Sequence, residues 1–141
     1  MRYERLEDGF YRVKLEYKDE IIESLKSFAR EHNIKGAFIQ GIGAGEDFEL
    51  GWFSTEKREY KRTHLVGDFE IVSLSGNIGV AENGEPVVHA HICLAGEDYE
   101  CLGGHLFRGV ISVTAEILVV ESQSKFLRKK EPESNLQLWH I

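Results

Sequence analysis

The sequence has little cysteine, with two residues among 141. Cys93 and Cys101 are too few for a disulfide framework, and their C-x7-C spacing matches neither a zinc ribbon nor a redox C-x-x-C pair. This usage favours a reducing compartment, so we expect a cytoplasmic protein. Cys93 continues an apolar strand and is predicted to be a core residue.

Long apolar runs are also missing. No window approaches the ~18 apolar residues that indicate a membrane span. The start of the chain, Met1–Arg5, lacks the apolar segment of a secretory signal peptide. We therefore expect a soluble, unexported protein with no membrane partner.

Positive charge is in deficit, because 17 lysines and arginines stand against 24 acidic residues and give a net charge of −7. Such a chain repels phosphate backbones unless its basic residues form one patch. The basic clusters, 57–62 and Arg128-Lys129-Lys130, lie beside acidic residues and are predicted to be solvated charged surface. Direct DNA binding is therefore not expected.

Apolar periodicity predicts several short strands and one clear helix. The helix is expected to begin after Asp19, which would cap it, and to end at 33–36. Strands are expected at 11–17, 37–39, 48–52, 68–74, 110–120 and 136–139, with a hairpin over 78–94 that turns at Asn83-Gly84. The length fits one domain, residues 1–141. The fold class is therefore predicted to be α+β, a mostly antiparallel β-sheet with flanking helices.

The glycine-rich segment Gly41–Gly45 resembles a phosphate-binding loop only superficially. Such loops need a helix N-terminus directly after the glycines. Here Glu46 and Asp47 follow, and the next pattern is that of a strand. We therefore expect backbone turns and close packing at these glycines.

Two histidines interrupt the apolar segment 87–94. Side chains alternate along a strand, so His89 and His91 share one face and their backbones lie ~6.6 Å apart. Paired imidazoles on one face indicate either a metal or acid/base site, or polar residues on a solvent-facing surface. His105 is the third candidate ligand, because Gly103-Gly104 would let a loop turn it inward. Together the three could bind zinc or another divalent metal.

Two carboxylates could serve such a site. Glu116 interrupts the apolar strand 111–118, and Glu70 lies in Phe69-Glu70-Ile71. A lone buried carboxylate is costly, so Glu116 is expected either to be paired or metal-linked, or to lie at an oligomer interface with solvent. Both are candidate catalytic residues.

The motifs that surround these residues resemble a known family. They are the segment Gly67–Ile78, His89-Ala90-His91, Gly103-Gly104-His105-Leu106 with Gly109, and Ala115-Glu116. Together they look like the plants-and-prokaryotes-conserved (PPC) domain. The resemblance implies a compact sheet with flanking helices that assembles as a homotrimer.

In prokaryotic single-domain members of that family, the resemblance further implies a histidine cluster suited to zinc. In this sequence the cluster would be His89, His91 and His105. Plant relatives carry an AT-hook for DNA ahead of the domain, but this sequence has no Arg-Gly-Arg-Pro core. A DNA-binding role is therefore not carried over.

A cupin is the structural rival, since its first motif also contains His-x-His. Gly84 and Glu97 flank the histidines at intervals each about one residue from the cupin pattern, and the second cupin motif is missing. Two functions remain. One is a metal- or small-ligand-binding or assembly module, and the other is a metal-dependent, hydrolase-type enzyme. No independent nucleophile motif is present, which favours the module.

Overall fold

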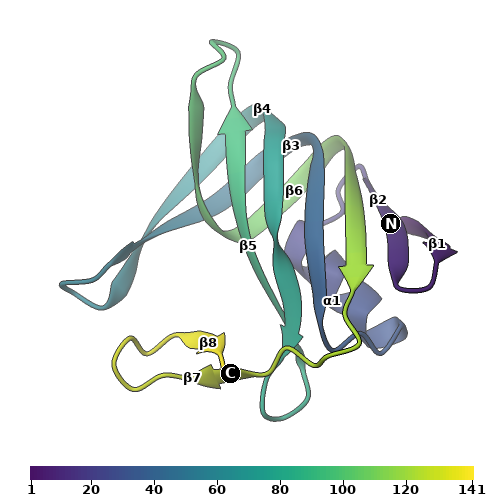
Figure 1. The fold of residues 1–141 in the computed structure, drawn as a ribbon. Coiled ribbons are helices and arrows are strands. Elements are labelled where there is room, and N and C mark those ends of the chain that lie inside the picture. The colour runs from purple at the N-terminus through teal and green to yellow at the C-terminus, as the bar shows by residue number, and fades with distance from the viewer.

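Six antiparallel strands form one sheet in the computed structural model, which describes residues 1–141 (Figure 1). Its strand order is β1-β2-β6-β3-β4-β5, and β5 also pairs with β6. A ribbon of β7 and β8 is separate from the sheet. The elements are β1 (Arg2–Glu7), β2 (Phe10–Glu16), α1 (Ile21–Glu31), β3 (Ala37–Ser54), β4 (Glu59–Val80), β5 (Pro86–Ala95), β6 (Cys101–Glu121), β7 (Arg128–Lys130) and β8 (Gln137–Trp139).

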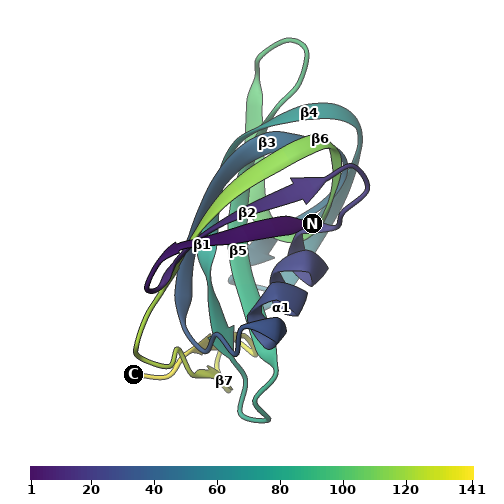
Figure 2. The ribbon, with the colours of Figure 1, turned by 90° about the vertical axis from the view of Figure 1, so that its right-hand side faces the viewer.

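The predicted antiparallel sheet is confirmed, whereas the plural flanking helices are wrong. One helix, α1, covers one face of the sheet (Figure 2). It begins one residue later than predicted, because the Glu20 carboxylate caps it by accepting a hydrogen bond from the Glu23 amide at 2.7 Å. Asp19 instead accepts from the Glu16 amide. The other oxygen of Glu20 accepts from the Gly109 amide, which ties the start of the helix to β6.

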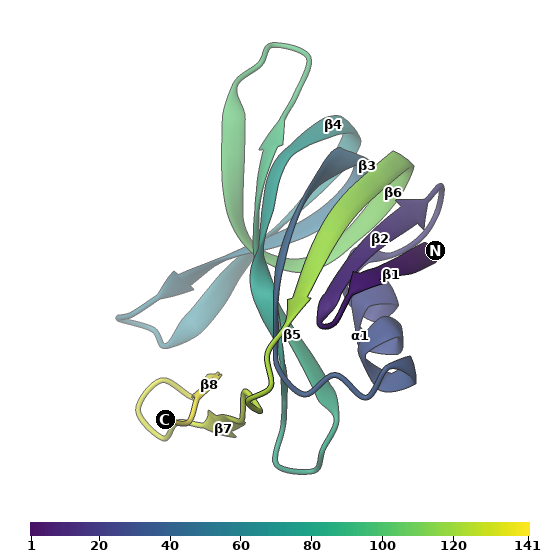
Figure 3. The ribbon, with the colours of Figure 1, turned by 45° about the vertical axis from the view of Figure 1, so that its right-hand side comes forward.

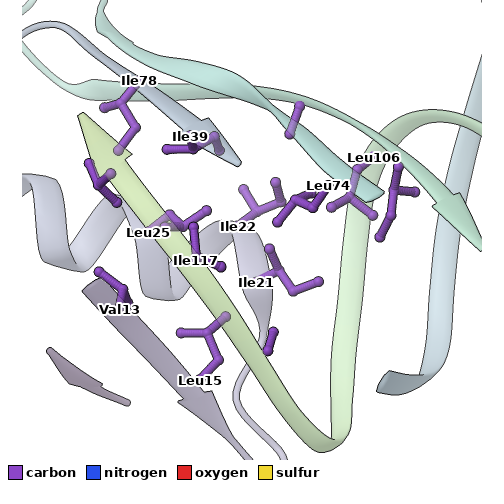
Figure 4. Packing of buried hydrophobic residues seen from close by; sticks show 14 of the residues in the cluster. Val13, Leu15, Ile21, Ile22, Leu25, Ile39, Leu74, Ile78, Leu106 and Ile117 are labelled. Atoms are coloured by element: carbon purple, nitrogen blue, oxygen red, sulfur yellow. The ribbon is translucent and has the colours of Figure 1, made fainter. Parts of the chain in front are cut away.

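The core lies between α1 and the facing side of the sheet. Leu25 and Phe28 of the helix are fully buried, as are Val13 and Ile78 of the strands. Figure 4 shows Ile22 and Leu25 of the helix among side chains from β2, β3, β4 and β6. We call the opposite side of the sheet the outer face. Because one face packs on α1, alternate residues of each strand point to the outer face.

Several predicted short strands are parts of long ones. Segments 37–39 and 48–52 both belong to β3, which has β-bulges between Gly41 and Gly43 and between Gly45 and Asp47. The expected turns at these glycines are therefore wrong, but the expected close packing is confirmed. A Cβ atom on Gly43 would lie 2.3 Å from the carbonyl oxygen of Thr114. Glycine allows β3 and β6 to approach at this point.

The predicted hairpin over 78–94 is confirmed and joins β4 to β5. Its turn differs from the two-residue Asn-Gly turn that is common in hairpins, in which both central residues have a positive φ. Only Gly84 has a positive φ, of 87°, and its amide donates to the Ala81 carbonyl at 2.9 Å. The loop is therefore longer than a two-residue turn.

The C-terminal ribbon lies on the outer side of the sheet. Figure 3 shows the strands of the sheet between α1 and the pair β7–β8. Phe126, just before the ribbon, packs against Phe38 of β3 with ring centroids 5.2 Å apart. No helix in the structure has the length and apolarity to cross a membrane.

We predict that Gly43→Ala lowers the free energy of unfolding by about 2 kcal/mol, because the new methyl group would overpack the β3–β6 contact. Urea denaturation measures this change. Gly96→Ala is the control, since its Cβ would have no neighbour closer than 3.5 Å, and it should change stability by less than about 0.5 kcal/mol. Equal stability of the two variants would contradict the account of these glycines.

Candidate metal centre

Strand alternation places His89 and His91 on the outer face of β5. Ala90, Ile92 and Leu94 point the other way and are buried in the core. The two imidazoles have ring centroids 5.4 Å apart. The predicted division of this strand into an apolar and a histidine face is therefore confirmed.

His105 reaches the same place by strand pairing. It lies within β6 and directly opposite His91 in the β5–β6 register, so the predicted loop is wrong. The two glycines before it allow neighbouring strands to approach closely. A Cβ on Gly103 would lie 2.4 Å from the Ile92 carbonyl oxygen, and a Cβ on Gly104 would lie 2.8 Å from the Gly51 carbonyl oxygen. His105 is thus fixed by backbone hydrogen bonding.

The three imidazoles converge. Their candidate ligand atoms all lie within 4.8 Å of one another. The ring centroid of His105 is 5.1 Å from that of His89 and 5.5 Å from that of His91. Three nitrogens at this spacing could hold one divalent ion.

Aromatic side chains support His105 from behind. Its ring centroid lies 5.0 Å from that of Tyr60 and 4.6 Å from that of Phe107. Gly51 makes room for both rings, because a Cβ there would come within 2.5 Å of Phe107 and 2.8 Å of Tyr60. Within this setting, Nδ1 of His105 is buried and has no hydrogen-bond partner. An unpartnered buried nitrogen fits a site made to receive a ligand.

The environment keeps two of the imidazoles neutral near pH 7. Burial lowers the pKa of His89 to about 4, with a further contribution from the positive charge of Arg128. Burial likewise lowers the pKa of His105 to about 4. A neutral imidazole is the form that binds metal, so both residues have the protonation state that binding requires. At His89, however, the Nδ1 lone pair accepts a hydrogen bond from Arg128.

Arg128 of β7 is the neighbour that sequence reasoning missed. The basic cluster 128–130 was predicted to be solvated, but Arg128 is only 3% exposed. Its Nη2 donates to Oδ1 of Asn77 at 2.6 Å and to Nδ1 of His89 at 3.2 Å, and its Nη1 donates to the Gln137 carbonyl at 2.8 Å. The sequence of 128–130 does not distinguish Arg128 from the two lysines that follow it. The pairing of β7 with β8 does, because it places Arg128 opposite the aromatic ring of Trp139.

The candidate carboxylates lie elsewhere on the sheet. Glu116 is exposed and sits between Lys14 and Ile42 in the strand register, 11 residues beyond His105 and on the order of 30 Å along β6. Glu70 is also exposed and pairs with Ala44 and Ala95. Neither belongs to the histidine cluster.

The prediction that Cys93 is a core residue is wrong. It is half-buried on the histidine side of β5, two residues beyond His91, and both cysteines are free thiols. Burial raises the pKa of the Cys93 thiol, as does its neighbour Cys101. The thiol is therefore protonated at neutral pH and is a poor metal ligand in that form.

The donor set fits a zinc-like ion. Three imidazoles from two adjacent strands match three-histidine zinc sites, in which a fourth position stays open for water or another ligand. A bound ion would supply Lewis acidity at that position. The three histidines would hold it, and Tyr60 and Phe107 would keep the ring of His105 in place.

Fold and site together define a class of protein: a single antiparallel sheet with one covering helix and a triad of histidines on its outer face. The family model of the Plants and Prokaryotes Conserved (PCC) domain matches residues 5–123. The chain therefore belongs to this family, as its motifs predicted, and the cupin alternative is wrong.

Solved structures agree with this assignment. A plant- and prokaryote-conserved protein of Pyrococcus horikoshii is 34% identical, with 99% of this chain and 94% of that one covered and a TM-score of 0.86. A metal-containing protein of Archaeoglobus fulgidus is 30% identical over 94% and 93% of the two chains, with a TM-score of 0.85. A candidate DNA-binding protein of Bacteroides thetaiotaomicron is 27% identical over 99% and 96%, with a TM-score of 0.93. No curated protein matches.

The depressed pKa values of His89 and His105 predict how the metal-free domain responds to acid. In the unfolded state histidines bind protons near pH 6.5. In the folded state His89 and His105 do so only near pH 4, which is their lowered pKa. The unfolded state therefore binds more protons in this window, and stability falls as the pH drops from about 6.5 to about 4. Urea denaturation of chelator-treated protein at several pH values measures the slope.

His105→Phe is the matched variant, because the new ring can pack between Tyr60 and Phe107 without titrating. Its stability should depend less on pH between 7 and 4.5 than that of the wild type. His140→Phe, at an exposed position near the C-terminus, should keep the wild-type slope. If the stability of His105→Phe fell with pH as steeply as that of the wild type, the lowered pKa of His105 would be contradicted.

Proposed function

We propose that the chain forms a homotrimer that binds a divalent metal ion, zinc first among them, and acts as a metal- or ligand-binding or assembly module. The observation that carries the metal part of this proposal is the convergence of His89, His91 and His105, whose ligand atoms lie within 4.8 Å of one another. The metal-containing relative from Archaeoglobus fulgidus supports it further.

Exposed apolar residues on the outer face support self-association. Ile42 is 60% exposed and Leu118 is 42% exposed, and both line a groove of about 780 Å³ between β2, β6 and β3. Arg12, Lys14 and Glu116 also line it. Apolar side chains surrounded by charges of both signs are typical of surfaces that bind another protein chain. A second copy of this chain suits that surface, and Glu116 would then lie at the interface.

A metal-dependent, hydrolase-type enzyme is the second candidate, because three histidines leave a coordination position open. Such chemistry needs a general base within hydrogen-bond reach of the bound water. Glu70 and Glu116 lie outside the cluster within one chain. The binding or assembly module is therefore better supported.

Direct DNA binding is not part of the proposal, although one relative is a candidate DNA-binding protein. The net charge of −7 opposes contact with phosphates. Two members of the basic clusters already have partners within the chain. Arg62 pairs with Glu49, and Arg128 is buried and donates to the Gln137 carbonyl of the ribbon.

The metal proposal predicts that the purified protein, after chelation and reloading, binds about one zinc ion per chain, and that His89→Ala, His91→Ala and His105→Ala each weaken binding. Because each residue would be a direct ligand, the loss should exceed the ~10–100-fold effect of an outer partner. Competition with a chromophoric chelator measures the affinity. His140→Ala, at an exposed position, should bind as the wild type does. Unchanged affinity in all three variants would contradict the site.

The assembly proposal predicts a solution mass of three times 16.1 kDa at micromolar concentration. Ile42→Asp should shift the mass toward the monomer, because it would place a charge in the apolar part of the interface. Tyr99→Asp alters another exposed side chain, in the β5–β6 loop, and should leave the mass unchanged. Light scattering after size-exclusion chromatography reports the mass. A monomeric wild type would rule out the trimer.

A further inference from the structure

The charge of Arg128 has no counter-charge in the structure. It is the one charged residue among the buried ones, at 3% exposure. All of its hydrogen-bond partners are neutral: an amide oxygen of Asn77, the carbonyl of Gln137 and Nδ1 of His89. Its Nε is buried and has no partner. Burying an unpaired guanidinium is costly, so the arrangement needs a reason outside stability.

The proposed metal site makes the imbalance larger. The three histidines add no negative charge, and no Asp or Glu joins their cluster. A divalent ion there would raise the local charge to about +3 together with Arg128, in a half-buried setting where charges interact strongly. Arg62, the other nearby cation, already pairs with Glu49 at 2.9 Å. One or more negative charges are therefore missing from the site.

On this basis, and resting on the proposed metal site, we propose that the centre is a receptor for a carboxylate-bearing small molecule. One carboxylate oxygen would take the open metal position, and the Arg128 guanidinium would bind the carboxylate. A planar guanidinium fork matches a carboxylate in both charge and geometry. His91 is exposed, so the ligand can enter from solvent.

The hydrogen bond between Arg128 and His89 links the two halves of this receptor. An arginine can only donate, so Nδ1 of His89 accepts the bond from Nη2. A metal-bound histidine normally offers its second nitrogen to an acceptor, which Arg128 is not. Without an anion, Arg128 therefore opposes metal binding at His89, whereas a bound carboxylate turns the same guanidinium into a favourable partner. Metal and carboxylate should bind cooperatively.

The test measures cobalt(II) affinity of the intact protein with and without acetate, at constant ionic strength. Cobalt serves as a probe because its visible absorption reports a change of ligand. In the wild type, acetate should tighten cobalt binding about tenfold and shift the spectrum, since the coupling must be reciprocal. Acetamide has the same shape without the charge and should do neither. In Arg128→Gln, cobalt should bind at least as tightly as in the wild type without acetate, and the acetate effect should fall below about twofold.

Two further variants separate the proposal from a folding defect. Arg128→Lys keeps the charge and should retain part of the acetate effect. Lys129→Gln changes the neighbouring, more exposed residue of β7 and should respond as the wild type does. Thermal unfolding checks that each variant keeps the fold.

The remaining outcomes overturn the proposal. Equal acetate effects in the wild type and Arg128→Gln would remove the role of Arg128. Cobalt affinity that rises with protein concentration but ignores acetate would show that a carboxylate of a second copy fills the place of the small molecule. Cobalt binding that depends on neither acetate nor protein concentration would reject this inference and leave the proposed metal site standing. A wild type that binds no cobalt would reject both.

Discussion

The pairing of β5 with β6 is the interaction on which the histidine cluster depends. β5 already pairs with β4, so the contact with β6 fixes the strand from its second edge. His91 lies between Ser75 on one side and His105 on the other. Because backbone hydrogen bonds set this register, a shift of one residue would turn the histidines to the opposite face. The site is therefore as rigid as the sheet that carries it.

The sequence predicted what local patterns determine. Alternation of apolar residues in 88–94 identified the strand and the face of His89 and His91, and helical spacing in 21–29 identified α1 and its buried side. Both patterns depend only on how side chains repeat along one element. His105 was named as the third candidate because Gly103-Gly104 could turn it inward, and the family resemblance agreed. The sequence nevertheless placed it on a loop, whereas it lies in β6.

Long-range contacts account for what the sequence could not predict. The glycines of 41–45 were expected to turn the chain, but they allow β3 to pack closely on β6, some seventy residues further on. Arg128 was expected in solvent, but the fold of the ribbon covers it and brings it to Asn77 and His89. In each case a partner distant in sequence decides the outcome, and residue type alone does not reveal that partner.

The ribbon β7–β8 lies beyond residues 5–123, the part of the chain that matches the family model, yet it provides the cation beside the histidines. The three candidate ligands, by contrast, come from paired strands inside the matched part. The centre is thus divided between the paired strands that the family model matches and a short C-terminal ribbon beyond that match. With this division, a substitution in the ribbon would change the charge beside the histidines without altering the register of the strands that carry them.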